Sequence, residues 1–248
     1  MNRLRNLLPA PVRSWLNRSR QAARRSLLIF DRVQDWSALR RLTPYRTDFG
    51  AMRGTCIDRV YIEQFLDTYR DSIRGRVAEI GSDHYTRLFG SRLVTHSDIL
   101  DIAVQNDRRT ITIDLAQTAE APENRFDCII CTQTLFEIFD YASAIRTLHK
   151  MLAPSGVLLA TLPGISQSVR GRMLGGAGSD WWRFTGASAA RAFAEVFTRD
   201  NVTVHTYGNV LAATAFLHGI VKEELTPAEL QYHDPDYEVT IAVRSIKR

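Results

Sequence analysis

The sequence has no long apolar run. Its longest apolar stretch, residues 210–221, falls short of the roughly 20 residues that cross a bilayer, and it includes a histidine and a glycine. The N-terminus is basic, but its apolar stretch LLPAPV is short and holds two prolines, which makes a poor secretory signal. These absences argue against a helical membrane protein or a secreted one, and they predict a cytoplasmic protein.

Cysteine is also scarce, with three residues in 248, which argues against a disulfide scaffold. Cys128 and Cys131 form a C-x-x-C pair within FDCIICT, a pattern typical of a buried strand. Because side chains alternate along a strand, an offset of three residues places the two sulfur atoms on opposite faces. We therefore expect two core thiols and no metal site.

Acidic residues are nearly missing from the first part of the chain. Residues 1–46 hold 11 arginines and 2 aspartates, a net charge of +9, whereas the remainder carries 21 basic and 25 acidic residues, a net of −4. The high isoelectric point thus belongs to an N-terminal arm, residues 1–46. The body, residues 47–248, is mildly acidic, which argues against a nucleic-acid-binding domain.

The arm has the pattern of a basic amphipathic helix over residues 12–33. Trp15, Leu27 and Phe30 fall on one side of such a helix, and most of the arginines fall on the other. This pattern favours an anionic membrane surface, which would place the protein at the inner face of the membrane. Packing on its own domain or on a second subunit, RNA binding and an organellar transit peptide stay open as alternatives.

From residue 76 onward, strand-like and helix-like segments alternate, which is typical of a parallel sheet with crossover helices. The pattern predicts an α/β, Rossmann-like fold with seven strands in a largely parallel sheet. Residues 47–75 are expected to form a lid segment with a helix that begins near residue 57. Residues 208–236 are expected to form an insertion with its own helix. The expected strands cover residues 76–80, 92–96, 110–113, 126–132, 157–163, 201–207 and 237–246, with helices over 141–152 and about 187–198.

Ligands on such sheets bind beyond the carboxyl ends of the strands. Four positions are expected to follow a strand end, namely Gly81, Asp98, Asp114 and the segment 132–135. Each has an alternative interpretation, since the aspartates could cap helices and the glycine could serve a turn. Four such loops in register predict a cofactor site more strongly than any single motif.

The loop after the first strand, in VAEIGSDHYTRLFG, has only one glycine where dinucleotide loops carry several. Asp83 and Tyr85 take those positions, and Asp83 would bring negative charge beside a pyrophosphate. The loop therefore disfavours a phosphate-bearing cofactor. S-adenosylmethionine, which has no phosphate and carries an ammonium group, fits better.

The succession VAEIGS, SDILD, TIDLA, FDCIICTQTLFEI and LHKMLAPSGVLLATLPG resembles the class I S-adenosylmethionine-dependent methyltransferases. The resemblance covers residues 76 to about 207 and is closest to the small bacterial type associated with glycan biosynthesis. It implies a fold of six parallel strands plus an antiparallel C-terminal strand. It also implies S-adenosylmethionine as cofactor and transfer of its methyl group to a small polar acceptor, with a sugar hydroxyl or glycan precursor as the first candidate.

The resemblance also implies roles by position. Asp98 would bind the ribose hydroxyls, and Asp114 with Leu115 would flank the adenine. The methionine part of the cofactor and its sulfonium would contact residues of the first and fourth loops, which are Glu79, Gly81, Tyr85, Thr132, Gln133 and Thr134.

Two segments are candidates for the acceptor side. Ahead of the first strand, Arg59 or Tyr61 would reach the cofactor or cap the site, unless their helix simply packs on the core. After the fifth strand, Trp181 and Trp182 beside Arg183 suit a sugar, because indole faces stack on sugar rings and a guanidinium binds hydroxyls. The alternative is that this aromatic segment anchors the next helix, which begins near a capping Thr185 or Ser188.

A hydroxyl acceptor must lose a proton during methyl transfer, and the insertion offers two weak candidates for the base, His218 and His233. Two other functions compete with a methyltransferase. A non-catalytic binding or scaffold protein in a membrane-associated assembly is favoured by the thinned glycine loop and the basic arm. A nicotinamide-dependent oxidoreductase is weaker, because the phosphate loop does not match.

Overall fold

The computed structural model describes residues 40–90, 92–102, 106–169 and 180–248. The chain divides into one unit that ends at Thr43 and a second from Pro44 to Arg248, and all described helices and strands belong to the second. The amphipathic helix expected over residues 12–33 lies outside the described residues and stays a prediction, as does the boundary at residue 46.

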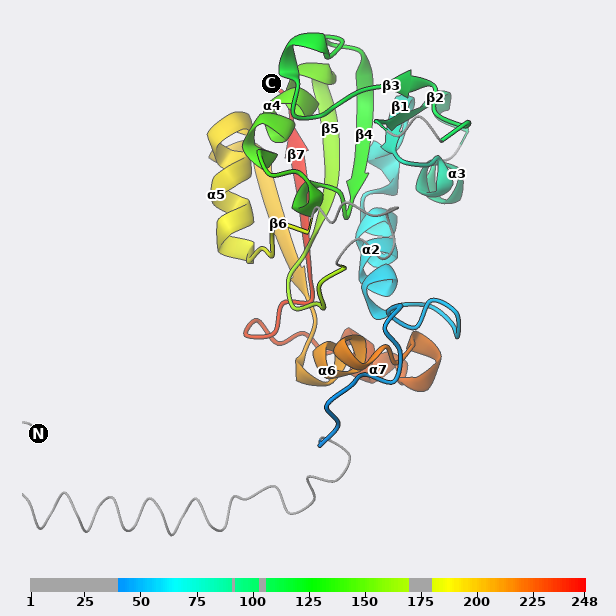
Figure 1. Cartoon of the computed structure of the whole chain (residues 1–248). Helices are drawn as coiled ribbons and strands as arrows, with labels where there is room; N and C mark the ends of the chain where they lie inside the picture. Colours follow the sequence, from blue (N-terminus) through cyan, green and yellow to red (C-terminus); the bar gives the residue numbers. More distant parts are fainter. Residues whose placement is uncertain (1–39, 91, 103–105, 170–179) are drawn as a thin grey trace, which may run out of the picture. The chain divides into compact units, whose positions relative to one another are not determined.

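A seven-stranded mixed sheet forms the centre of the second unit, in the order β3-β2-β1-β4-β5-β7-β6 (Figure 1). Neighbours from β3 to β5 pair in parallel, and β7 runs antiparallel to both β5 and β6. The predicted Rossmann-like fold, with its antiparallel C-terminal strand, is confirmed. The strands are β1 Gly75–Ile80, β2 Val94–Asp101, β3 Ile111–Thr112, β4 Phe126–Thr132, β5 Leu152–Pro163, β6 Val202–Tyr207 and β7 Thr240–Ile246.

Helices cover both faces of the sheet, with α4 and α5 on one face and α2 and α3 on the other (Figure 1). Apolar residues of α4 repeat at helical spacing and bury Ala144, Ile145 and Leu148 against the strands. The helices are α2 Ile57–Thr68, α3 His84–Phe89, α4 Tyr141–Met151, α5 Gly186–Phe197, α6 Val210–His218 and α7 Pro227–Gln231.

The two strand cysteines lie on opposite faces of β4, as predicted. Cys128 packs in the core under α2 and α3, and Cys131 packs in the core under α4 and α5. Burial raises the pKa of both thiols, that of Cys131 to about 12. Among the described residues, no group of acidic, histidine or cysteine side chains is arranged to hold a metal ion.

Two element ends differ most from the predictions, by five residues each. The strand β5 begins at Leu152 rather than at 157, because Leu152 already pairs with Phe126. The APSG segment forms an irregularity in register, and regular pairing resumes at Val157. The strand β2 ends at Asp101, so the prediction that it ends before Asp98 is wrong. The expected cap of α5 is confirmed, because Thr185 and Ser188 hydrogen-bond each other's backbone N–H groups as a capping box.

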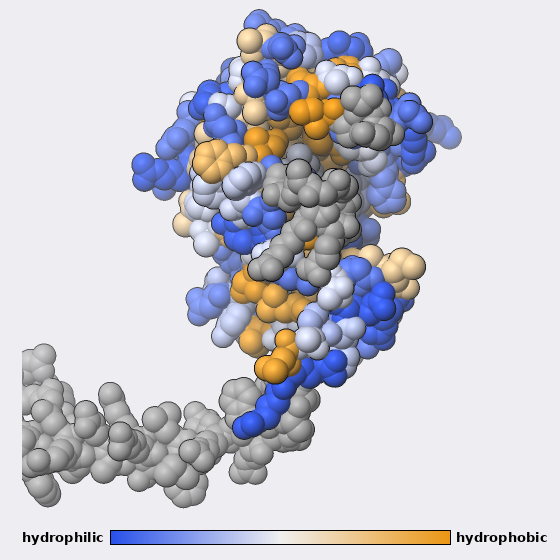
Figure 2. All heavy atoms as spheres, viewed as in Figure 1, coloured by the Kyte–Doolittle hydropathy of each residue, from blue (hydrophilic) through white to orange (hydrophobic). Residues whose placement is uncertain are grey.

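The insertion between β6 and β7 contains α6 and α7, both capped by polar side chains, Asn209 and Thr226. One side of α6 is buried, whereas Val210, Leu211 and Leu217 are exposed. Figure 2 shows apolar surface over this part of the molecule. No helix in the described part of the chain is long and apolar enough to cross a membrane.

Candidate active site

Gly81 forms the turn that follows β1. Its φ of +78° is the left-handed conformation that glycine adopts without strain, and its backbone N–H donates to the carbonyl of Leu100 in β2. A side-chain carbon added here would have no atom within 4 Å, so the space above the turn is open. The one glycine of the loop therefore stands at the position where the backbone conformation requires glycine, and the space beside it is open.

We expect Gly81→Ala to lower the free energy of unfolding by about 1 kcal/mol, through backbone strain alone, since the new methyl group meets no neighbour. Urea denaturation measures this effect. Gly90→Ala is the contrasting variant, because its methyl group would overlap the carbonyl oxygen of Thr86. A loss at Gly81 as large as that at Gly90 would contradict an open turn.

Glu79, near the end of β1, is buried and binds the start of α3. Its carboxylate accepts hydrogen bonds from the backbone N–H groups of Tyr85 and Thr86, at 3.0 and 2.7 Å, and from the hydroxyl of Thr86 at 2.8 Å. The Ser82 hydroxyl donates at 3.2 Å. Glu79 thus shapes the loop after β1 by holding the N-terminus of a short helix.

Asp98 lies within β2, level with Ala78 of β1, and is 3% exposed. Arg76 donates to it from two nitrogens at 2.9 Å each, and the Thr110 hydroxyl donates at 2.8 Å. Burial opposes ionisation, but these hydrogen bonds and the charge of Arg76 hold the pKa of Asp98 below its ordinary value. Asp98 therefore joins strands inside the sheet and does not lie at the carboxyl end of β2.

The carboxylate at the end of β2 belongs to Asp101. The register pairs Ile80 with Leu100, which brings Asp101 level with Gly81. The Asn106 side-chain amide joins the two, donating to Asp101 at 2.6 Å and to the Gly81 carbonyl at 2.9 Å. The residue that sequence reasoning missed was the second aspartate of SDILD, and only the strand register distinguishes it from the first.

Asp83, which departs from the usual glycine pattern, is neutralised by two arginines. Arg108 donates to its carboxylate at 2.6 Å, and Arg87 forms an ion pair with it at 3.2 Å. These contacts tie the loop after β1 to the segment after β2. Where related loops have a further glycine, this loop therefore has an aspartate that is held in place by ion pairs.

Asp114 follows β3, as predicted, and its carboxylate accepts a hydrogen bond from the Ala116 N–H at 2.9 Å within its own turn. Leu115 is 6% exposed and packs in the core. After β4, Gln133 has a φ of +46° and donates its N–H to the Thr161 carbonyl of β5, while the Thr134 hydroxyl donates to the Thr132 carbonyl. This bent segment exposes Gln133 at the end of the two central strands.

Two cavities adjoin at this edge of the sheet. The first, the loop cavity, has a volume of about 540 Å³ and lies over the ends of β1 and β4. Its wall includes Glu79, Ser82, His84, Tyr85, Thr132 and Gln133 from the sheet side, and Gly54, Thr55, Arg59 and Glu63 from the segment before β1.

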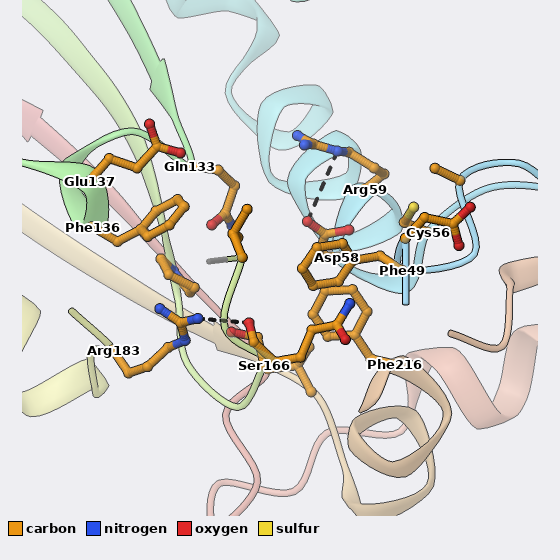
Figure 3. A pocket seen from close by; sticks show the side chains of 16 residues that line it. Phe49, Cys56, Asp58, Arg59, Gln133, Phe136, Glu137, Ser166, Arg183 and Phe216 are labelled. Atoms are coloured by element: carbon orange, nitrogen blue, oxygen red, sulfur yellow. Dashed lines mark hydrogen bonds and ion pairs between the residues drawn. The ribbon is translucent and has the colours of Figure 1, made fainter. Parts of the chain in front are cut away.

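The second, the aromatic cavity, has a volume of about 310 Å³ and lies toward β5. Figure 3 shows Phe136 and Glu137 on one side and Asp58 and Arg59 of α2 on the other. The two cavities share Ala51, Cys56, Arg59 and Gln133, so they form one continuous site. The rest of the aromatic cavity is lined by Asp48, Phe49, Pro163, Ser166, Gln167, Val169, Arg183, Phe216 and Val239.

Arg59 and Tyr61 occupy different environments. Arg59 lies at the wall that both cavities share, forms an ion pair with Asp58 and donates to the Tyr85 hydroxyl at 3.5 Å. Tyr61 is 1% exposed and stacks on Tyr207 in the core beneath the insertion. The prediction that Tyr61 reaches the site is wrong, because it lies on the buried side of α2.

The tryptophan pair does not line the aromatic cavity. The Trp182 indole N–H donates to the carbonyls of Ile138 and Phe139, and the backbone N–H groups of Trp181 and Trp182 donate to the Phe136 carbonyl. Both tryptophans therefore hold the segment after β4, Trp182 through its indole and Trp181 through its backbone alone. The Trp181 indole is exposed outside this cavity, and its stacking on a sugar stays a prediction. Arg183 does line the aromatic cavity, where it contacts Asp180 and the Gln167 carbonyl.

Neither histidine of the insertion lines the two cavities. His218 ends α6, where its ring contacts Tyr45. His233 is exposed and lies 3.0 Å from the Thr206 hydroxyl of β6. The prediction that one of them is the catalytic base is not supported by their positions.

Sequence reasoning missed the carboxyl groups of the aromatic cavity. Burial and the negative charge of Asp180 raise the pKa of Glu137 to about 7, and burial raises the pKa of Asp58. The glutamate of the motif FEI, a few residues after the fourth strand, was visible in the sequence as a possible site residue. The sequence did not show that its carboxyl group is buried.

A family model for the methyltransferase domain matches residues 48–202. The chain belongs to the methyltransferase-domain family. This methyltransferase is an S-adenosylmethionine-dependent enzyme, and the match spans the lid segment and the first five strands and ends where β6 begins. A comparison with curated proteins finds no significant match.

Solved structures share the fold at low sequence identity. The CurJ carbon methyltransferase is 15% identical, with 81% of this chain and 57% of that chain covered and a TM-score of 0.52. An S-adenosylmethionine-dependent methyltransferase from Mesorhizobium loti is 14% identical, with 77% and 98% covered and a TM-score of 0.50. A putative sarcosine dimethylglycine methyltransferase from Galdieria sulphuraria is 13% identical, with 76% and 86% covered and a TM-score of 0.50.

The residues of this methyltransferase fit its cofactor. The open space above Gly81 admits close approach of a ligand to the backbone, and the loop cavity is large enough for the amino-acid part of S-adenosylmethionine. Carboxylates at the ends of β2 and β3, Asp101 and Asp114, suit hydroxyl and amino donors of the adenosine. When bound, the cofactor supplies an electrophilic methyl group on a positively charged sulfur.

Proposed function

We propose that this methyltransferase transfers the methyl group to a hydroxyl of a sugar or glycan precursor. The observation that carries the proposal is the aromatic cavity, which adjoins the loop cavity at Gln133 and Arg59. The phenyl rings of Phe49, Phe136 and Phe216 provide apolar faces there. A sugar ring presents C–H groups to such faces and its hydroxyls to charged groups at the rim.

The polar groups of the aromatic cavity suit several hydroxyls rather than one charge. Asp58 and Arg59 pair across 4.0 Å on α2, and Arg183 is held by Asp180 on the other side. Each pair is neutral in itself, so these groups together with the Glu137 carboxyl disfavour an anionic acceptor and offer hydrogen-bond partners to the hydroxyls of a polyol. Its volume of about 310 Å³ matches a small ligand of one or two rings.

In the proposed complex, the methionine part of the cofactor occupies the loop cavity and Asp101 binds the ribose hydroxyls. Asp101 takes the role that the resemblance assigned to Asp98, because Asp101 lies at the strand end beside Gly81. Gln133 and Arg59, common to both cavities, would lie where the methyl group meets the acceptor. Catalysis then rests mainly on holding the two reactants in line.

Incubation with S-adenosylmethionine and a panel of methyl glycosides tests the proposal, with O-methyl products identified by mass spectrometry. Phe49→Leu, which keeps apolar volume but removes a ring face, is expected to raise the acceptor KM roughly fivefold, for the loss of about 1 kcal/mol of stacking, and to leave the cofactor KM unchanged. Phe139→Leu is the control, since Phe139 is 66% exposed and lines neither cavity. Methylation of amines but of no glycoside would contradict a hydroxyl acceptor.

A further inference from the structure

The segment that follows β4 carries one carboxyl group into the aromatic cavity. Glu137 ends the short 3-10 turn Leu135–Glu137, four residues after Gln133, and it lines the cavity beside Phe136 (Figure 3). Its backbone N–H donates to the Thr134 carbonyl. The position of Glu137 is therefore tied to that of Gln133, at the junction of the two cavities.

This turn is held firmly from outside. The backbone N–H groups of Trp181 and Trp182 donate to the Phe136 carbonyl at 3.0 and 3.3 Å, and the Trp182 indole N–H donates to the next two carbonyls, those of Ile138 and Phe139, at 3.2 Å each. Four hydrogen bonds thus fix the residues on both sides of Glu137. A side chain that acts on a reacting atom must be held in a fixed position, and these hydrogen bonds provide that support.

Other ionisable groups of the aromatic cavity are already engaged. Asp48 accepts two hydrogen bonds from Arg46, Asp58 pairs with Arg59, and Arg183 is held by Asp180 just outside the lining. Burial raises the pKa of the Cys56 thiol to about 11, so it stays protonated at neutral pH. Within the described residues, by contrast, the Glu137 carboxylate accepts no hydrogen bond, and only burial and the charge of Asp180 act on it.

We propose that Glu137 is the general base that removes the proton from the acceptor hydroxyl. The inference rests on the proposed function, because an acceptor hydroxyl must lose its proton during the transfer. The hydroxyl oxygen bonds to the methyl carbon as the carbon–sulfur bond breaks, and the electron pair of that bond returns to sulfur. The proton passes to the Glu137 carboxylate and then to solvent, so that charge and atoms balance.

The electrostatics of the cavity support this role. Burial raises the pKa of Glu137 to about 7, with a further contribution from the charge of Asp180, whose own charge is balanced by Arg183. The other charged groups of the cavity, Asp58 and Arg59, form a pair on the opposite wall. Glu137 is thus poised to lose its proton near neutral pH, where a base is most effective.

The first test of the proposal needs no acceptor. Because the pKa of Glu137 is higher in the folded than in the unfolded state, its contribution to stability is fully present below the unfolded value and is lost as the pH rises toward 7. Glu137→Gln removes this dependence. Its melting temperature relative to that of the wild type should therefore rise by about 2–4 °C between pH 4.5 and pH 8. Parallel curves for the two proteins would overturn the proposal.

The second test uses the methyl glycosides and measures turnover together with S-adenosylhomocysteine affinity by calorimetry. Glu137→Gln should lose about 100-fold in kcat, and the rise of the wild-type rate through pH 7 should disappear, while the affinity for S-adenosylhomocysteine stays unchanged. Glu120→Gln, an exposed glutamate of another short turn, is the matched control for both tests.

The two hypotheses fail in different ways. If the wild type methylates a glycoside and Glu137→Gln does so equally fast, the base is another group and the proposed function stands. If the melting curves differ as expected but the wild type methylates no glycoside, the hydroxyl acceptor is wrong, and the base role falls with it.

Discussion

Asp101→Ala is expected to weaken binding of S-adenosylhomocysteine by roughly 100- to 1000-fold. Asp101 ends β2 beside Gly81, where its carboxylate would accept two hydrogen bonds from the ribose hydroxyls. Hydrogen bonds to a charged group contribute about 1.5–3 kcal/mol each, and 1.4 kcal/mol corresponds to a factor of ten in affinity. Isothermal titration calorimetry of the wild type and the variant measures the difference.

Asp98→Ala is the matched control for this prediction, since it removes the same group three residues earlier. Asp98 is buried and bound by Arg76 and Thr110, so its loss should lower the free energy of unfolding by about 2 kcal/mol and leave ligand affinity within a few-fold. The pKa of Asp98 lies below its ordinary value, so its stabilising effect is present at neutral pH and is lost on acidification. The reverse pattern, with affinity lost at Asp98 and kept at Asp101, would reject the assignment.

Glu79→Ala is expected to lower the free energy of unfolding by about 3 kcal/mol. The substitution leaves the backbone N–H groups of Tyr85 and Thr86 buried without their acceptor, and each such group costs about 1–3 kcal/mol. Urea denaturation at pH 7 measures the loss. Glu79→Gln should recover only part of it, because a side-chain amide offers one acceptor oxygen where the carboxylate uses two.

The second consequence of Glu79→Ala concerns the ligand. Glu79 holds the loop that lines the loop cavity, so S-adenosylhomocysteine affinity should fall as the start of α3 loosens. Glu120→Ala, at an exposed glutamate, should change neither quantity. Unchanged stability in Glu79→Ala would show that α3 does not depend on this carboxylate.

Several features of the fold could be predicted because they depend on local pattern. The largely apolar FDCIICT segment identified β4 at its observed bounds, and the spacing of Ala144, Ile145 and Leu148 identified α4. The cap of α5 followed from Thr185 and Ser188. The opposite placement of Cys128 and Cys131 followed from strand alternation alone.

The site was less predictable, because strand pairing and burial decide which side chains reach it. Nothing in SDILD says which aspartate ends the strand, and the answer comes from the register between Ile80 and Leu100. An indole such as that of Trp182 is suited to stack on a sugar ring, yet its N–H donates to the carbonyls of Ile138 and Phe139 after β4. Tyr61 was placed at the site on chain position, but the face of α2 that it occupies is buried.

By itself, the sequence determined a seven-stranded α/β fold with a single-glycine loop, because the alternation of strands and helices depends on consecutive residues, and its motifs carry the resemblance to methyltransferases. The tertiary structure decided which carboxyl groups face the ligands. Asp98, Asp101 and Glu137 are chemically alike in the chain. Only strand register and burial, which involve residues distant in sequence, set one inside the sheet, one at its edge and one in the aromatic cavity.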